Sequence, residues 1–201
     1  MALEVSKFEP PVISSPSVVS SPPVISSPPV ISAPSHTSSH SNSLIVFPVN
    51  LLDPQNLGSI IRTSTFYGCS ALLTTLKHSC DYTPIVSKAS AGCMESFENL
   101  YRTKSPSQFL KNAKAEGYKI IGTGLNTKTT TESNNEISSF SKLILLLGNE
   151  GNGLTQEILN LCDFNLTIPA IYNSNPANLD SLNVSVATGI LLDRLRKFNL
   201  F

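Results

Sequence analysis

An excess of charge of either sign is the first thing this sequence lacks. Fourteen lysines and arginines are matched by fourteen aspartates and glutamates, so the formal net charge at pH 7 is zero. A protein without net charge has no overall field that draws it to nucleic acid or to an anionic membrane. Any RNA or DNA partner must therefore be held by local contacts.

Paired cysteines and long apolar runs are also missing. The four cysteines form no CxxC pair, and His78 is the only histidine beyond residue 43. This pattern predicts neither a zinc site nor a disulfide framework, and it fits a reducing compartment. The longest apolar run, residues 143–147, is far shorter than the roughly 18 residues of a membrane span. We therefore expect a soluble protein with no metal and no membrane partner.

The first 43 residues are built from a six-residue repeat rich in proline and serine. The copies read PVISSP from Pro11, SVVSSP from Ser17, PVISSP from Pro23 and PVISAP from Pro29. Proline removes backbone donors, and serine offers little apolar area to offset the entropy of ordering. We expect residues 1–43 to be a disordered, polyproline-like tail. The tail has no arginine, which makes it a poor transit peptide.

From residue 44 onward, short β-like runs alternate with helical patterns. This alternation is typical of an α/β protein with a mostly parallel sheet, and we expect one domain over residues 44–201. Strands are predicted at 44–49, 71–75, 119–124, 141–147 and 164–168. Helices are predicted from 56 to a stop at Gly68, at 106–116, from 155, and at 181–197, with a polar loop at 126–139. The 141–147 run is apolar throughout, as in a strand buried on both faces.

The segment DPQNLGSIIR, residues 53–62, is the first of three stretches that packing alone does not explain. Asn56 is expected to cap a helix whose buried face holds Leu57, Ile60, Ile61 and Ser64. Gly58 lies one turn before Arg62 on another face and clears room for a backbone or a ligand beside the guanidinium. A fork of donors that keeps its charge suits a phosphate or a ribose beside one. A surface arginine on an amphipathic helix is the plainer alternative.

The second stretch is GNEGNG, residues 148–153, directly after the buried run. Glycines allow turns at positive φ and bring bare amides close to a ligand, and open α/β sheets bind ligands at strand carboxyl ends. Neither a GxGxxG fingerprint nor a P-loop is present, which disfavours dinucleotide or triphosphate binding. A tight connection before Thr155 explains this stretch equally well.

The third stretch follows Ile168-Pro169 and an eleven-residue loop at 170–180. Ser181 is expected to cap the last helix, and Asn183 places an amide in its first turn. These polar groups could orient a small ligand. An ordinary capped helix packed on the sheet is the alternative.

Taken together and in this order, DPQNLGSIIRTSTFYG, LLLGNEGNGL and IP…DSLNVSVATGILL resemble the three motifs of the SpoU/TrmH group of SPOUT RNA methyltransferases. The similarity covers residues 44–195. It implies a parallel α/β sheet whose C-terminal part forms a trefoil knot that cradles S-adenosylmethionine, in a homodimer. Residues 87–95, SKASAGCME, and the DSLNVSVATGILL ending are most similar to mitochondrial large-subunit rRNA ribose methyltransferases.

The resemblance implies metal-free transfer of a methyl group from S-adenosylmethionine to a ribose 2′-hydroxyl, with rRNA preferred to tRNA as substrate. It implicates Arg62 in activating that hydroxyl, through or beside an RNA phosphate. The family's other polar active-site positions correspond to Asn56, Glu150, Ser181 and Asn183. The cofactor cradle corresponds to Leu147, Gly148, Gly151, Gly153, Ile168, Leu182 and Asn183. The subfamily similarity implies a mitochondrial location, and the cytoplasm is the alternative.

Two departures from the family leave other functions open. The repeat tail stands where many relatives have an RNA-reading domain, and the 170–180 loop is longer than in the simplest bacterial relatives, which bears on cofactor affinity. One alternative is a catalytically inactive SPOUT-fold module for RNA binding or ribosome assembly. Another is an incomplete gene product whose tail comes from a misjoined exon.

Overall fold

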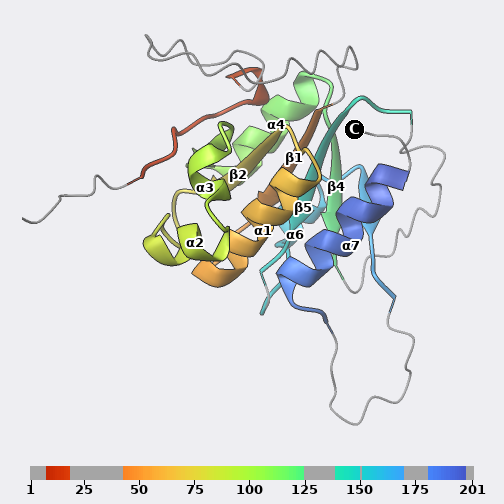
Figure 1. Ribbon diagram of the computed structural model, residues 1–201. Coiled ribbons are helices and arrows are strands. Elements are labelled where there is room, and N and C mark those ends of the chain that lie inside the picture. The colour runs from red at the N-terminus through yellow and green to blue at the C-terminus, as the bar shows by residue number, and fades with distance from the viewer. Residues whose placement is uncertain (1–7, 19–42, 125–138, 150, 170–180, 198–201) are drawn as a thin grey trace, which may run out of the picture.

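The computed structural model describes residues 8–18, 43–124, 139–149, 151–169 and 181–197. A six-stranded sheet forms the centre, with every pairing parallel and strand order β3-β2-β1-β5-β4-β6 (Figure 1). The strands are β1 (Ser43–Pro48), β2 (Ala71–Thr75), β3 (Leu100–Thr103), β4 (Lys119–Thr123), β5 (Lys142–Leu147) and β6 (Phe164–Leu166). The helices are α1 (Pro54–Phe66), α2 (Pro84–Ala89), α3 (Cys93–Ser96), α4 (Pro106–Ala115), α6 (Gln156–Leu159) and α7 (Val184–Lys197), with a short 3-10 turn, η1, at Pro16–Val18.

The two middle strands, β1 and β5, are the most buried part of the sheet. They pair in register from Ser43 with Lys142 to Pro48 with Leu147. Side chains 143–147 of β5 are almost fully buried, because helices cover both faces of the sheet. The prediction of a strand buried on both faces is thereby confirmed, and so is the α/β class with a parallel sheet.

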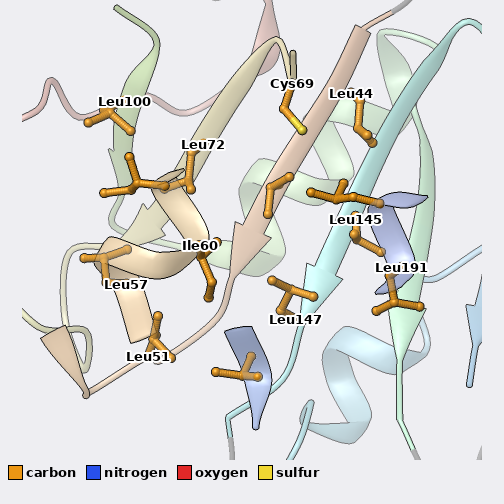
Figure 2. Packing of buried hydrophobic residues seen from close by; sticks show 14 of the residues in the cluster. Leu44, Leu51, Leu57, Ile60, Cys69, Leu72, Leu100, Leu145, Leu147 and Leu191 are labelled. Carbon is orange, nitrogen blue, oxygen red and sulfur yellow. The ribbon is translucent and has the colours of Figure 1, made fainter. Parts of the chain in front are cut away.

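Helices cover the sheet in two layers. On one face, α1, α2 and α7 pack over side chains such as Leu44, Leu72 and Leu145 (Figure 2). On the other face, α4 and α6 pack over alternate residues of the same strands, among them Phe47 and Ile144. The period-2 alternation of strands and the apolar stripes of the helices produce this three-layer arrangement. No helix in the described ranges has the length and apolar character needed to cross a membrane.

Helix α1 begins at Pro54, two residues before the predicted start at 56. Pro54 occupies its first turn, and the Asp53 side chain caps it by accepting a hydrogen bond from the Gln55 amide at 3.0 Å. Proline is pre-organised for the first helical position, and aspartate is among the preferred N-caps. The prediction that Asn56 caps this helix is therefore wrong, and Asn56 lies inside it. Gly68, at φ 69°, follows the helix end as predicted.

Helix α7 begins three residues later than predicted. Asn183, not Ser181, is the cap: its side-chain Oδ1 accepts from the Ser185 amide at 2.9 Å, and its carbonyl accepts from the Ala187 amide. An asparagine immediately before a helix satisfies donors that have no intrahelical partner. The other predicted strands and helices are found within one or two residues of their expected bounds, and most of the predicted 126–139 loop lies outside the described residues.

Residues 8–18 lie on the core, contrary to the expected disordered tail. The Arg102 amide donates to the Pro11 carbonyl at 2.8 Å, and the Ile13 amide donates to the Arg102 carbonyl at 2.7 Å. The segment thus extends the sheet beside β3 in parallel, and Ile13 is 6% exposed within the apolar cluster under α4. The expectation overlooked that a branched apolar residue of the first repeat, Ile13, finds a partner surface on the core. The domain boundary at residue 44 stays a prediction.

Removing residues 1–42 should therefore destabilise the protein. Burying an isoleucine side chain contributes about 1.5–3 kcal/mol, so we expect the free energy of unfolding, measured with urea, to fall by at least about 1.5 kcal/mol. Val12→Ala is the matched control, because Val12 is 47% exposed in the same segment. Its effect should stay within about 0.5 kcal/mol. A truncated protein as stable as the full chain would show that the segment adds nothing to the core.

Candidate functional site

The chain diverges at the carboxyl ends of the two middle strands. After β1 it turns into α1 on one face of the sheet and returns as β2. After β5 it turns into α6 on the opposite face and returns as β6 on the other side of β4. Open α/β sheets bind ligands in the crevice that such a divergence leaves outside the strand ends. This geometry places the candidate site beyond Pro48 and Leu147, which pair directly.

Two asparagines join the loops that leave these strands. The Asn149 side chain donates from Nδ2 to the Asn50 carbonyl at 2.8 Å, and its Oδ1 accepts from the Gly151 amide at 2.8 Å. Asn50 has φ 55°, a left-handed conformation that asparagine tolerates better than most residues. Sequence reasoning overlooked both residues, although an asparagine just after each of two buried strands was a usable signal.

The glycines after β5 serve the turn itself. A Cβ on Gly148 would lie 2.7 Å from the Gly153 carbonyl carbon and 2.9 Å from the Leu154 nitrogen. Gly153 has φ 63°, and it exchanges backbone hydrogen bonds with Asn149 in both directions. The predicted positive φ is confirmed for Gly153. Gly148 instead lets the turn fold back on the end of β5, whose last residue is Leu147, whereas a Cβ on Gly151 would meet only Asn149 Oδ1, at 3.4 Å.

The first and third sequence motifs meet at the start of α1 and α7. Asn183 donates from Nδ2 to Asn56 Oδ1 at 3.0 Å. Asn56 is only 6% exposed, whereas Asn183, Ser181 and Leu182 lie at the surface. The structure therefore brings two of the five predicted polar residues into direct contact across 127 positions of sequence.

Arg62 is exposed on α1 and makes no hydrogen bond or ion pair with any residue that the structure describes. It lies six residues beyond Asn56, about 9 Å along the helix axis at 1.5 Å per residue. The space beside Gly58 is filled by α2, because a Cβ on this glycine would lie 2.6 Å from Val86 O and 2.9 Å from Ser90 N. The predicted room for a backbone is confirmed, and no room for a ligand remains at Gly58 itself.

The remaining predicted residues have separate surroundings. Glu150 lies outside the described residues, as does the 170–180 loop. Ile168 packs against the cluster under α7, and the Arg194 guanidinium donates to the adjacent Thr167 carbonyl at 3.0 Å. This bond fastens the end of α7 to the chain that leaves β6.

The cysteines with raised pKa values are protonated thiols. Burial raises the pKa of Cys69 to about 12, and it raises the pKa values of Cys80 and Cys162 to about 11. Thiolates, not thiols, bind metals and act as nucleophiles. Among the described residues, no three histidine, cysteine, aspartate or glutamate side chains are grouped so as to hold a metal ion.

The Asn56–Asn183 hydrogen bond should contribute measurably to stability. In a double-mutant cycle with Asn56→Ala and Asn183→Ala, we expect a coupling free energy of about 0.5–1.5 kcal/mol in urea unfolding. The control pair Asn56→Ala with Ser181→Ala should show a coupling near zero, because the structure shows no bond between those side chains. Equal coupling in both pairs would mean that the asparagines do not act through this bond.

Residues 43–193 match the model of the SpoU rRNA Methylase family. The chain is 39% identical over 148 residues to mitochondrial rRNA methyltransferase 1 of Homo sapiens. The matched region covers 70% of this chain and 41% of that protein. It is 37% identical over 165 residues to the protein of the same name from Schizosaccharomyces pombe, covering 78% of this chain and 52% of that one. The chain thus spans about half the length of these relatives, or less.

Solved structures share the fold. The AdoMet-bound rRNA methyltransferase from Sinorhizobium meliloti superposes with a TM-score of 0.66 at 26% identity, over 77% of this chain and 56% of that one. The SpoU methyltransferase AviRb from Streptomyces viridochromogenes superposes with a TM-score of 0.63 at 26% identity, over 78% of this chain and 60% of that one. These matches confirm the expected fold class, an α/β knot fold with a parallel sheet.

Proposed function

Because this chain belongs to the SpoU rRNA methylase family, we propose that it is an S-adenosylmethionine-dependent RNA 2′-O-ribose methyltransferase acting on ribosomal RNA. The observation that carries the proposal is the contact between Asn56 and Asn183, since it joins two motifs that are distant in sequence at the starts of α1 and α7. The names of relatives that act on rRNA, and of one that holds AdoMet, support the substrate and the cofactor.

The residues at the crevice fit the cofactor. When bound, S-adenosylmethionine supplies an electrophilic methyl group on its sulfonium. Leu182 is 43% exposed beside Asn183, which also lies at the surface, so apolar and polar surface lie together at the start of α7. Pockets for small ligands combine apolar walls with a few placed polar groups. We propose that Leu147, Gly148, Gly151, Gly153, Ile168, Leu182 and Asn183 hold the cofactor.

Arg62 is the proposed catalytic residue. Its guanidinium does not lose its proton in proteins, so it cannot accept the proton of the 2′-hydroxyl. It instead stabilises the negative charge that develops on the attacking oxygen and orients the RNA phosphate, which takes the proton. The ribose oxygen forms the new bond to the methyl carbon as the carbon–sulfur bond breaks. Asn56, Glu150, Ser181 and Asn183 are proposed to position the reacting groups, which removes entropy from the barrier.

Cofactor binding and transfer are tested on the full chain in two steps. Isothermal titration with S-adenosylmethionine should give one site per subunit, and saturating cofactor should raise the melting temperature. A labelled methyl group should then appear at a ribose 2′ position of rRNA and not of tRNA. Absence of binding overturns the methyltransferase proposal. Binding without transfer favours the alternative of an inactive RNA-binding or assembly module.

A homodimer is also proposed. Four large apolar side chains in α1 and α7 or within two residues before them are exposed: Leu52, Phe66, Leu182 and Val186. Phe66 is 78% exposed at the end of α1, and α7 lies beside α1 over the same face of the sheet (Figure 1). Phe66 and Val186 belong to two helices that pack against each other, and exposed apolar patches mark association surfaces. Analytical ultracentrifugation should give twice the monomer mass, and Val186→Glu should restore the monomer mass. A wild-type monomer at micromolar concentration contradicts the proposal.

A mitochondrial location is proposed on the names of the relatives from Homo sapiens and Schizosaccharomyces pombe. Fluorescence of a C-terminally tagged chain should coincide with a mitochondrial dye. Diffuse cytosolic fluorescence would contradict this location and leave the proposed chemistry untouched.

A further inference from the structure

The docked segment beside β3 is held by backbone atoms that any similar peptide would offer. Its Pro11 carbonyl and Ile13 amide pair with the backbone of Arg102. Its Ser14 carbonyl accepts a hydrogen bond from Asn112 Nδ2, on α4, at 3.1 Å. Addition of a peptide strand to a sheet edge obtains its affinity from such main-chain bonds and its specificity from side-chain contacts.

The side-chain contacts of the segment repeat every three residues. Pro10, Ile13 and Pro16 are buried, whereas the intervening Pro11, Val12 and Ser14 are exposed. A polyproline II helix has three residues per turn, so every third side chain lies on one face. The buried face of the segment is therefore a stripe of the form Pro-x-x-Ile-x-x-Pro, which we call the PIP stripe.

The sequence carries the PIP stripe more than once. Residues 22–28, which contain the third repeat, place Pro22, Ile25 and Pro28 at the same spacing, and their hexapeptide PVISSP is identical to that at 11–16. The Ile25 amide and the carbonyls of Pro23 and Ser26 correspond in sequence to the amide and carbonyls that the docked segment uses. Because the stripe recurs along the chain, more than one copy of it can bind to the surface that β3 and α4 present to the first copy.

We propose that β3 and α4 form a binding site for the PIP stripe, and that residues 22–28 occupy it when the first copy is displaced. The chain length permits this exchange. Fourteen residues separate Pro28 from β1 at Ser43, and they reach about 50 Å when extended. Three strand spacings and one strand length amount to only about 30–35 Å.

One contact distinguishes the first register from the others. The rings of Phe8 and Tyr82 lie 5.8 Å apart between centroids, and the position equivalent to Phe8 in the third register is Ser20. An aromatic pair adds to stability beyond its buried area. The first copy is therefore the preferred occupant. The third copy is the alternative occupant, and its effective concentration at the site is high because it belongs to the same chain.

The test follows the Arg102 amide by NMR hydrogen exchange in three full-length variants. All three also carry Ile31→Asp, because the fourth repeat has the same stripe at Pro28, Ile31 and Pro34 and would otherwise compete for the site. In Ile13→Asp, the third copy takes the site, so exchange should stay within about threefold of the wild-type rate. In Ile13→Asp with Ile25→Asp, exchange should accelerate by about tenfold or more. Ile25→Asp alone is the matched control and should behave as wild type. Amides of β1 and β5 should stay protected in all three, which reports that the core is folded.

Each result decides the proposal. If Ile13→Asp alone loses protection as fully as the double variant, the site accepts only the first copy and the proposal is wrong. If the double variant keeps its protection, residues 22–28 are not the alternative occupant and the proposal is also wrong. A synthetic peptide PPVISSP at millimolar concentration should restore protection in the double variant, whereas PPVDSSP should not.

Discussion

Arg62→Ala is expected to lower the single-turnover rate of methyl transfer to RNA by about a hundredfold to a thousandfold, the usual loss for a donor that stabilises developing charge. The dissociation constant for S-adenosylmethionine should stay unchanged, because Arg62 lies on α1 and the proposed cradle is built from the loops after β5 and β6 and from the start of α7. Transfer of a labelled methyl group, measured beside a cofactor titration, reports both quantities on one preparation.

Two further variants make the Arg62 experiment specific. Arg62→Lys should recover little activity, since a point charge does not reproduce the planar fork of donors. Arg196→Ala is the matched control, because Arg196 is another exposed helical arginine, at the end of α7. Its turnover should equal that of wild type. Unchanged turnover in Arg62→Ala would remove the proposed catalytic role and leave the family membership intact.

Gly58→Ala is expected to reduce the free energy of unfolding by at least about 2 kcal/mol, the upper part of the range for overpacking. A Cβ at this position would lie 2.5 Å from Ala89 Cβ and within 3.0 Å of two backbone atoms, Val86 O and Ser90 N. The Ser90 amide donates a hydrogen bond to the Val86 carbonyl in the last turn of α2, so neither atom can move away from the new Cβ without breaking that bond. The helix propensity gained by alanine, about 1 kcal/mol, does not offset the separation of α1 from α2.

Gly189→Ala provides the matched control for that measurement. Gly189 is also a helical glycine, but the nearest atom to its Cβ would be Thr63 Cγ2 at 4.0 Å, an ordinary contact. Its substitution should stabilise the protein by up to about 1 kcal/mol through helix propensity alone. Urea unfolding of both variants should therefore give changes of opposite sign. Two changes of the same sign would show that packing against α2 does not decide the result at Gly58.

Local patterns predicted the elements well where a single physical cause dominates. The apolar run at 143–147 has the length typical of a strand covered on both faces, and Gly117 and Gly68 mark helix ends at positive φ. The start of α1 was misplaced because both Asp53 and Asn56 are suitable N-cap residues. Pro54 favours Asp53, since proline is pre-organised for the first helical position. Boundaries of this kind depend on two or three residues and not on periodicity.

Contacts between distant segments could not be derived from the residues alone. The partner of Asn56 is 127 positions away, and only the resemblance between motifs placed the two in one site. The docked repeat was missed for a related reason. Its composition indicates disorder, yet Ile13 gains a buried environment from β3 and α4, which follow about ninety residues later. Composition describes a segment in isolation, and docking depends on what it meets.

The register of the two middle strands has a consequence for synthesis on the ribosome. Ser43 of β1 pairs with Lys142 of β5, 99 residues later, whereas Ile45 pairs with Ala71 of β2 after only 26. At about 5–20 residues per second, β1 emerges roughly 5–20 s before the strand that closes its second edge. Sheets with such high contact order fold slowly, and their unpaired edges invite aggregation in the interval. The nascent chain thus passes through a half-assembled sheet with one open edge on β1, a natural substrate for chaperones.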